Sequence, residues 1–542
     1  MLGRWVDAPN VNINVLDRHV YQICQEQKSL LTNLVVQIGK YTTIMVGLLS
    51  LSKAVLLVAA GALASVNYPP IPEDLSTPFQ RRLAVYGPNA VSVGWNTYEK
   101  LNQSCVLYGT SADKLSSRSC GSKPSTTYET SRTWSNVAIL NNLTPATTYY
   151  YKIVSTNSTV DHFLSPRTPG DKTSFSMDVV IDLGVYGKDG FTVDSKKKDT
   201  IPVVQPELNH TTIGRLAQTV NDYEIVIHPG DFGYSDDWYL KFSNILQGKE
   251  AYQAILEQFY DQLAPIAGRK LYMASPGNHE ADCSEIPYLL ELCPEGQKNF
   301  TDFMHRFEDT MPVAFASSSS NKTAQALAAK ARRLSNPPFW YSFEYGLVHV
   351  TMIDTETDFP DAPDGTDGSA KLDSGPFGKA GQQLKFLEAD LASVDRTVTP
   401  WVVVAGHRPW YSTGFGNTCD SCQAAFENLL YKYGVDIGVF GHVHNSQRFL
   451  PVVNGTADPN GMKNPKAPLY IVAGGAGNIE GLSNVGSKPD YTEFVYADDY
   501  SYASLTFVDE QNLKVDFIRS STGENLDSST LYKEHKTPFV VQ

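Results

Sequence analysis

The chain has 542 residues, of which 42% are hydrophobic and 19% are charged. This composition excludes a disordered, collagen-like or coiled-coil protein and allows two or three domains with buried cores. The formal net charge is −14 and no basic block stands out, so a nucleic-acid partner is disfavoured and a small molecule is expected.

The N-terminal region reads as a targeting segment. An apolar run ends in an Ala-Leu-Ala pattern typical of signal-peptidase sites, which predicts an upstream extension and signal peptide over residues 1–64, cleaved near Ala64. Met45 could be the true start. The alternative is a retained anchor, because residues 43–66 are long enough to span a membrane. Lys53 inside the run favours cleavage, after which no stable membrane partner is expected.

The cysteines and glycosylation sequons agree with export. Seven cysteines occur, one of them in the leader, and the spacing of the other six suggests three local disulfides. A redox or metal role for Cys419-x-x-Cys422 is the alternative. We therefore predict a secreted glycoprotein, with the cell wall or a vacuole as other destinations. The expected disulfides are Cys105–Cys120, Cys283–Cys293 and Cys419–Cys422. The sequons are at Asn102, Asn142, Asn157, Asn209, Asn299, Asn321 and Asn454.

A linker over residues 65–75 precedes a segment of short strands, 76–168, separated by Gly, Asn, Ser and Pro turns. Residues 143–149 fit a tyrosine corner, in which the hydroxyl of Tyr149 bonds to upstream backbone. Trp95 is the expected core aromatic. This segment resembles a fibronectin type III β-sandwich.

From residue 169 to about 520 the pattern changes to buried strands alternating with amphipathic helices, which predicts an α/β domain. Apolar residues three to four apart predict helices around residues 252–263 and 384–394. The stretch 281–338 is predicted to be a surface excursion, and 521–542 a C-terminal tail. The predicted strands are 178–181, 224–227, 271–273, 348–353, 401–404, 437–440 and 469–472.

Five of these strands are followed by polar residues of metal-ligand type. Because ligands bind at the carboxyl ends of strands in open α/β sheets, we expect these residues to lie together. Neighbouring glycines predict tight turns that bring each side chain close. His228, His305 and His349 stand outside this pattern and are expected to be structural. The candidates are Asp182, Asp231, Asn278, His407, His442 and His444.

The polar residues form a series of motifs by which the chain resembles the purple acid phosphatases, a branch of the calcineurin-like metallophosphoesterases. The resemblance covers about residues 76–520. It implies a two-domain fold, a fibronectin III-like β-sandwich followed by an α/β metallophosphoesterase domain built as a β-sandwich flanked by helices. The motifs, in chain order, are D-x-G at Asp182, G-D-x-x-Y at Asp231, G-N-H-E at Asn278, a His motif at His407 and G-H-x-H at His442.

The resemblance implies a binuclear metal centre. Gly184 stands where relatives with ordinary divalent centres carry a His, and Tyr234 supplies a phenolate instead. A phenolate is a hard, anionic donor that suits Fe(III). The implied ligands are Asp182, Tyr234 and His444 for Fe(III), Asp231 as the bridge, and Asn278, His407 and His442 for a divalent ion, which could be Zn, Fe or Mn.

The implied activity is that of an acid phosphatase, in which a hydroxide held by the iron attacks a phosphate monoester in line. The resemblance also implies that His279 contacts phosphate and assists leaving-group protonation, with Glu280 as its support. Two alternatives remain, a secreted phosphodiesterase or nucleotide hydrolase of the same superfamily and a non-catalytic cell-surface binding module. The expected partner is a small phosphoester, and a homodimer is compatible with the sequence.

One departure from the family pattern concerns substrate contacts. Plant-type members carry further His residues in the loop after the fourth motif, whereas residues 412–419 here contain none. Arg408 and Asn417 could substitute for them.

Overall fold

The computed structural model describes residues 68–186, 211–240, 250–281, 293–312, 317–364, 381–414 and 418–542. All of them belong to one structural unit, Val66–Gln542. The predicted leader, Asn209, Cys283 and Asn417 lie outside the described residues. Among those described, none of the helices has the length and apolar character that a bilayer crossing needs.

The N-terminal domain is the predicted β-sandwich, with Trp95 fully buried in its core. The backbone N–H of Thr144 donates to the hydroxyl of Tyr149 over 3.0 Å, which confirms the tyrosine corner. The Cys105–Cys120 disulfide joins two paired strands, as predicted. One sheet contains β1 (Phe79–Gly87), β2 (Ala90–Thr97) and β5 (Trp134–Leu140), and the other contains β4 (Ser117–Cys120), β3 (Cys105–Gly109), β6 (Thr148–Ile153) and β7 (Asp161–Leu164).

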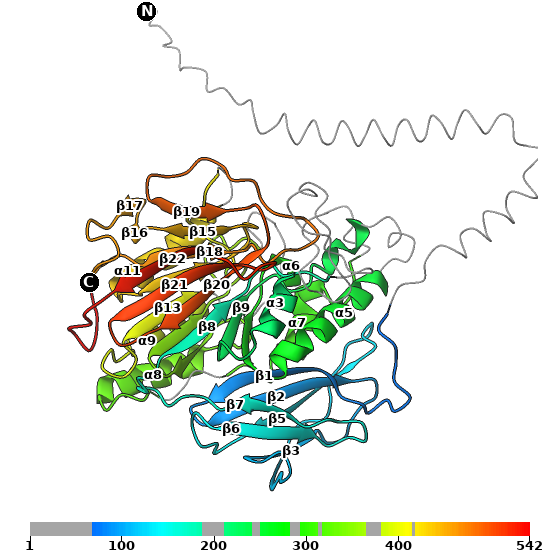
Figure 1. Cartoon of the computed structure of the whole chain (residues 1–542). Helices are drawn as coiled ribbons and strands as arrows, with labels where there is room; N and C mark the ends of the chain where they lie inside the picture. The colour runs from blue at the N-terminus through cyan, green and yellow to red at the C-terminus, as the bar shows by residue number, and fades with distance from the viewer. Residues whose placement is uncertain are drawn as a thin grey trace, which may run out of the picture. The chain divides into compact units, whose positions relative to one another are not determined.

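The second domain is built on two sheets (Figure 1). One has the order β22-β21-β20-β8-β9-β10 and continues through β1 into the sandwich, and the other has the order β11-β12-β13-β14-β18-β15-β19. Each predicted strand of this domain is present, although the first, predicted over 178–181, lies earlier, over Phe175–Val179. The first sheet uses β8 (Phe175–Val179), β9 (Ile225–Pro229), β10 (Leu271–Ser275), β20 (Ser501–Phe507), β21 (Asn512–Arg519) and β22 (Asn525–Tyr532). The second uses β11 (Tyr341–Tyr345), β12 (Val348–Met352), β13 (Trp401–Ala405), β14 (Ile437–Phe440), β15 (Ser446–Phe449), β18 (Leu469–Ala473) and β19 (Thr492–Tyr496).

The two sheets pack against each other and enclose the core. Phe175 of β8 meets Tyr345 of β11 edge-on, with ring centroids 5.0 Å apart. At another point the hydroxyls of Ser446 on β15 and Ser501 on β20 lie 2.8 Å apart. Strands β8, β9 and β10 run parallel, as do β12, β13, β14 and β18, so each sheet presents several carboxyl ends at one edge.

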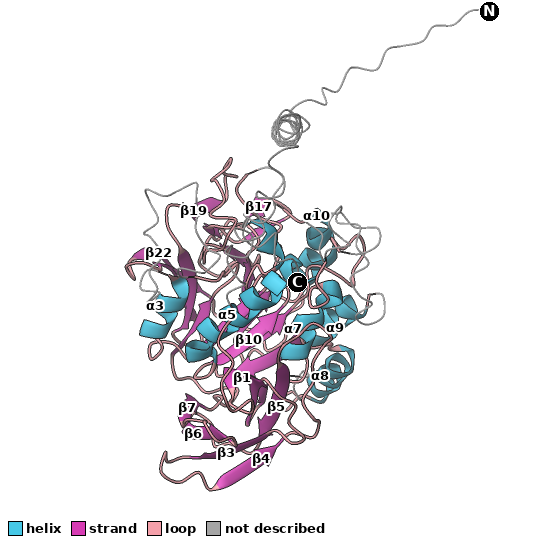
Figure 2. Cartoon of the chain, turned by 90° about the vertical axis from the view of Figure 1, so that its right-hand side faces the viewer, coloured by secondary structure: helices cyan, strands magenta, loops and turns pink. Residues whose placement is uncertain are grey.

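Helices cover the outer faces of the sheets (Figures 1 and 2). Both predicted amphipathic helices are present, as α5 and α9, and α5 packs against β1. The described helices are α3 (Thr212–Gln218), α5 (Glu250–Ala267), α6 (Asn278–Ala281), α7 (Thr301–Phe307), α8 (Lys322–Leu334), α9 (Gln382–Leu391), α10 (Asp420–Cys422) and α11 (Asn428–Lys432).

The prediction that residues 281–338 form a surface excursion is wrong for much of the stretch. Phe303 and Phe307, one helical turn apart on α7, are buried against Phe232 of the core. The spacing of these two rings creates an apolar helix face that must be covered. The α7 part of this stretch therefore belongs to the core of the domain.

The same helix fastens the sandwich to the second domain. Arg306 on α7 pairs with Asp302 over 2.7 Å and donates to Gln80 of β1 over 2.7 Å. Arg82 of β1 in turn donates to the carbonyl of Arg306 over 3.0 Å. Strand β1 also pairs with β10 at one register position, Leu83 to Leu271 (Figure 2). Because buried charges are tolerated only when paired, these contacts fix one docking geometry.

The C-terminal segment differs from expectation. Strand β22 pairs along β21, so the sheet extends beyond residue 520, where we placed the start of a tail. Beyond it, the carbonyl of Pro538 accepts from the backbone of Arg396 over 2.7 Å, and the backbone of Gln542 donates to Lys432 over 2.8 Å. The chain is thus anchored up to its last residue.

His349 has the structural place that the sequence predicts. It is buried on β12, with Nε2 2.9 Å from Oδ2 of Asp390 and Nδ1 3.8 Å from Oε1 of Glu344. Burial alone lowers the pKa of His349, but Asp390 and Glu344 outweigh it and raise the pKa to about 9. The charged imidazolium therefore ties α9 to the sheet.

Replacing His349 by Gln should destabilise the protein in a pH-dependent way. The folded pKa lies above the ordinary value, so the stabilisation is full below about pH 6.5 and is lost as the pH rises through about 9. We expect a loss of about 3 kcal/mol at pH 6 that shrinks markedly at pH 9.5, measured by urea unfolding. His305→Gln is the control, because burial lowers the pKa of His305. A loss for His349→Gln that is equal at both pH values would contradict this account.

Candidate metal centre

The candidate ligands gather where the two sheets present the carboxyl ends of their parallel strands. Asp182 follows β8, Asp231 follows β9 and Asn278 follows β10, while His407 and His442 follow β13 and β14. Four candidates have left-handed backbone, a conformation that costs free energy for residues other than glycine. They are Asp182 (φ 60°), Asp231 (φ 56°), Tyr234 (φ 50°) and His442 (φ 64°).

Glycines in the motifs allow these side chains to approach. A Cβ on Gly277 would lie 2.2 Å from Oδ1 of Asp231, and one on Gly230 would lie 2.5 Å from Nδ1 of His407. A Cβ on Gly441 would lie 2.5 Å from Oδ2 of Asp182. Real Cβ atoms do not tolerate such distances, so the glycines are a steric requirement of the centre.

The hydroxyl of Tyr234 lies within one of two groups of candidate ligand atoms. Its oxygen is 3.0 Å from Oδ1 of Asp182, 3.1 Å from Oδ2 of Asp231 and 2.8 Å from Nε2 of His444. Nδ1 of His444 faces the carbonyl of Gly481 at 3.0 Å, which makes Nδ1 the protonated nitrogen and leaves Nε2 a lone pair. A single phenol proton cannot satisfy two carboxylates and an imidazole lone pair.

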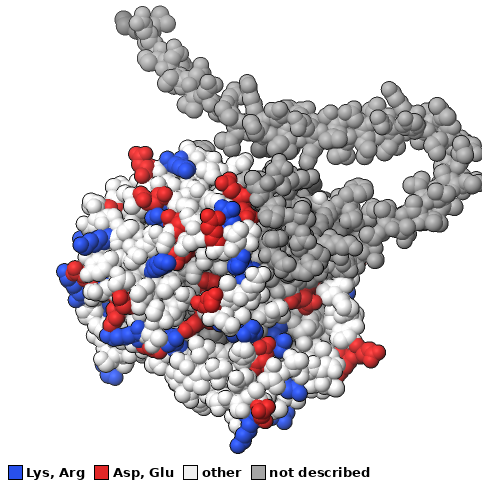
Figure 3. Space-filling view, in the orientation of Figure 1, with Lys and Arg blue, Asp and Glu red and all other residues white. Residues whose placement is uncertain are grey.

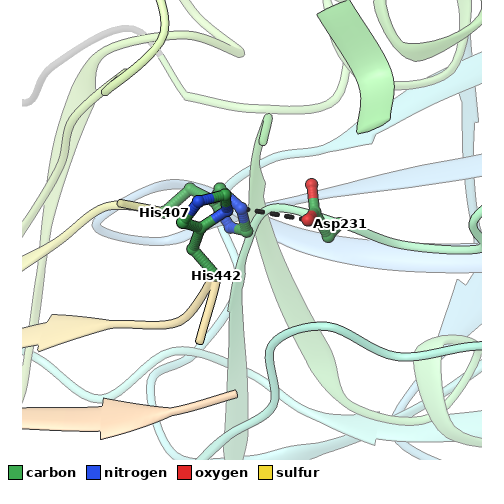
Figure 4. A group of neighbouring side chains, drawn as sticks. All are labelled: Asp231, His407 and His442. Atoms are coloured by element: carbon green, nitrogen blue, oxygen red, sulfur yellow. Dashed lines mark ion pairs between the residues drawn. The ribbon is translucent and has the colours of Figure 1, made fainter. Parts of the chain in front are cut away.

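His407 belongs to the second group of candidate ligand atoms. Its Nε2 is 3.0 Å from Oδ2 of Asp231 and 3.0 Å from Oδ1 of Asn278. The ring of His442 lies beside it, with centroids 5.2 Å apart, and Figure 4 shows His407 directed at Asp231. Asp231, His407 and His442 have ligand atoms within 4.8 Å of one another, close enough to hold one metal ion. Asp231 contacts both groups of candidate ligand atoms, as a bridging ligand would.

Without a bound cation, the acidic groups of this site do not all favour their ionised forms. Burial raises the pKa of Asp182 well above its usual range. Burial also acts to raise that of Asp231, but His407 and His279 hold it well below its usual range. Burial and the two carboxylates raise the pKa of Tyr234 well above 10. A bound cation would favour the ionised forms of all three groups, and oxygen and imidazole donors suit iron and divalent first-row metals. The donor set therefore fits two metal ions.

His279 lies beside the centre and outside the group formed by Asp231, His407 and His442. Its Nδ1 lies 2.9 Å from Oδ2 of Asp236, and its Nε2 lies 3.9 Å from Oδ2 of Asp231. Burial lowers the pKa of His279, but Asp236 and Asp231 outweigh it and raise the pKa well above its usual range. Asp236 was missed from the sequence, although it stands two residues after Tyr234, at the start of the 3₁₀ helix η1 (Asp236–Leu240).

Glu280 has a different role from the one expected. Instead of supporting the His279 ring, its carboxylate accepts three backbone N–H groups over 2.9 Å each, from Gly277, Asp231 and Phe232. It therefore locks together the two loops that carry Asp231 and Asn278.

A further side chain at the centre is Arg408. Its Nε donates to Oε2 of Glu356 over 2.7 Å, and its Nη1 lies 3.0 Å from Nε2 of His442. The sequence places Arg408 directly after His407 but gives no indication of its direction.

The remaining candidates lie apart from the centre. Cys419 and Cys422 form a disulfide, so this pair does not act as a metal ligand, and Cys293 is also disulfide-bonded. His228 packs on Phe232 and lies 2.6 Å from the hydroxyl of Tyr272, a structural place as predicted. The six described sequon asparagines are exposed: Asn102, Asn142, Asn157, Asn299, Asn321 and Asn454.

Comparison with known proteins identifies three matching segments. Residues 78–168 match the purple acid phosphatase N-terminal domain, residues 207–446 the calcineurin-like phosphoesterase domain, and residues 467–528 the iron/zinc purple acid phosphatase-like C-terminal domain.

Similar proteins agree with these matches. The chain is 66% identical over 502 residues to acid phosphatase A of Cryphonectria parasitica, covering 91% of this chain and 99% of that one. It is 30% identical to an acid phosphatase of Aspergillus ficuum, covering 73% and 75% of the two chains. A solved purple acid phosphatase from yellow lupin seeds superimposes with a TM-score of 0.59 at 23% identity, covering 85% of this chain and 75% of that one.

Replacing Gly277 by Ala should weaken metal binding. The added methyl group would displace Asp231 and the loop that carries Asn278, and lost support around metal ligands typically costs about 10- to 100-fold in metal affinity. The measurement is metal content by mass spectrometry after dialysis against graded chelator. Gly87→Ala is the control, because its Cβ would meet Ala90 at an ordinary 3.4 Å. Unchanged metal retention in Gly277→Ala would contradict the steric argument.

Proposed function

The chain belongs to the purple acid phosphatases and is an acid phosphatase, and we propose that it is secreted and hydrolyses phosphate monoesters at a centre of Fe(III) and one divalent metal. The observation that carries the proposal is the placement of the Tyr234 hydroxyl between two buried carboxylates and the lone pair of His444. Phenolate and carboxylate oxygens are hard, anionic donors that suit Fe(III), and imidazole also suits iron.

The residues would divide between two ions that share Asp231. Asp182, Tyr234 and His444 would hold Fe(III). Asn278, His407 and His442 would hold Zn, Fe or Mn. When bound, the pair supplies Lewis-acid stabilisation of phosphoryl charge and acidifies water at low pH.

His279 is the proton donor in this proposal. Asp236 accepts the Nδ1 proton and so orients the ring, leaving the Nε2 proton directed toward the centre. Because its neighbours favour the charged imidazolium, Nε2 can bind a phosphoryl oxygen and deliver a proton to the departing alcohol oxygen. Glu280 keeps the two ligand loops in register and touches no reacting group.

Three features support secretion. The leader ends in a signal-peptidase pattern, the described cysteines are disulfide-bonded, and the described sequons are exposed. On the face in Figure 3, acidic and basic side chains are interspersed, a surface typical of soluble proteins. The same signals are compatible with the cell wall or a vacuole as the destination. A homodimer is also compatible with the sequence.

Tyr234→Phe tests the ferric centre. The purified wild type should show a violet charge-transfer band of tyrosinate bound to Fe(III), and the variant should lose it. The measurement is a visible spectrum with metal analysis on the same sample. Tyr341→Phe removes another buried hydroxyl, bonded to the carbonyl of Ala274, and should leave the band intact. A colourless wild type that holds two divalent metals would exclude the ferric centre.

His279→Ala tests the proton donor. Removal of a general acid typically lowers turnover by about 10²- to 10⁴-fold, and we expect this loss in kcat with a monoester that has a poor leaving group. Colour and metal content should persist, because His279 is not a ligand. If the variant lost its metals, His279 would be a ligand and its role here misassigned.

A further inference from the structure

We propose that Arg408 binds the phosphoryl group of the substrate and selects phosphate monoesters over diesters. The proposal rests on the proposed function and adds a specificity-determining residue to the same site. Its basis is a guanidinium that is fixed from behind by a buried carboxylate and directed at a candidate metal ligand.

The anchor of Arg408 is built from residues at the end of β12. Glu356 is fully buried and accepts Nε of Arg408 over 2.7 Å, while the backbone N–H of Arg408 donates to Thr355 over 2.9 Å. Glu356 is itself held, since its other oxygen accepts the hydroxyl of Thr355 over 3.1 Å and its backbone N–H donates to Asp354 over 2.8 Å. The guanidinium plane is therefore set before any substrate arrives.

The free end of Arg408 lies at the open side of the centre. The Arg408 side chain is 18% exposed, whereas Glu356 is 0% exposed. His442 is also the partly exposed member of the group in Figure 4, and Nη1 of Arg408 lies 3.0 Å from its Nε2. Solvent, and hence a substrate, reaches this side.

The contact with His442 cannot persist once the centre is loaded. A metal ion and the Nη1 proton both require a lone pair of that imidazole, and a metal beside a guanidinium repels it. Arg408 stays tied to Glu356 and is also stabilised by the nearby carboxylate of Asp364. Its Nη1, once released from His442, is then directed at the centre. A phosphoryl group there would accept from it, and guanidinium N–H groups match phosphoryl oxygens in pairs.

This placement favours monoesters for two reasons. A monoester dianion carries three terminal oxygens and two negative charges, whereas a diester carries two oxygens and one charge. The fixed guanidinium of Arg408, with its paired N–H donors, therefore binds a monoester more strongly than a diester. Arg408 also precedes residues 412–419, the stretch that lacks the His residues expected from the family pattern.

The test compares full-length, metal-replete wild type with Arg408→Met and Arg408→Lys. For each protein we would measure metal content, the dissociation constant of inorganic phosphate by calorimetry, and kcat/KM for p-nitrophenyl phosphate and bis(p-nitrophenyl) phosphate. Arg167→Met is the matched control. Arg167 also forms a largely buried ion pair, with Nη2 2.6 Å from Oε1 of Glu224, and this pair does not belong to the centre.

Arg408→Met should lower kcat/KM for the monoester by about 10- to 100-fold and weaken phosphate binding by a similar factor, the range of charged hydrogen bonds. The diester rate should fall by less than about 3-fold, Arg408→Lys should recover part of the loss, and Arg167→Met should match wild type. Equal losses for both esters, unchanged phosphate affinity or loss of metal would overturn the proposal. A wild type that hydrolyses neither ester would instead overturn the proposed function.

Discussion

The structure depends on one crowded set of buried donors, the hydroxyl of Tyr234 between the carboxylates of Asp182 and Asp231. Such a cluster is costly in a protein interior unless a cation neutralises it. The surrounding chain is arranged to hold it nonetheless. Left-handed backbone at the candidate ligands, and glycines with no room for a Cβ, bring the donors together, and Glu280 clamps two of the loops.

The rest of the fold makes this cluster rigid. Ligands come from strand ends in two different sheets, so the sheets must pack in one register for the donors to meet. The sandwich domain adds to this constraint through β1 beside β10 and through Gln80 of β1, which accepts from Arg306 of α7. The candidate ligands themselves all lie in the second domain, which assigns the sandwich a supporting role.

Around the donors lies a layer of orienting residues. Asp236 sets His279, Glu356 sets Arg408, and the carbonyl of Gly481 sets the tautomer of His444. In each case a side chain that faces the centre is fixed from behind by a hydrogen bond. Precise positioning of charge, with little reorganisation during the reaction, is how such sites stabilise a developing phosphoryl charge.

The sequence by itself determined the two domains, seven strands and two amphipathic helices of the second domain, and the motifs that carry the candidate ligands, because hydrophobic periodicity and short motifs are local properties. It also located the tyrosine corner and the Cys105–Cys120 and Cys419–Cys422 disulfides. Only the tertiary structure decided which distant groups meet. Asp236 beside His279, Glu356 behind Arg408, and the packing of Phe303 and Phe307 on Phe232 are contacts between segments, and a local pattern does not identify the partner.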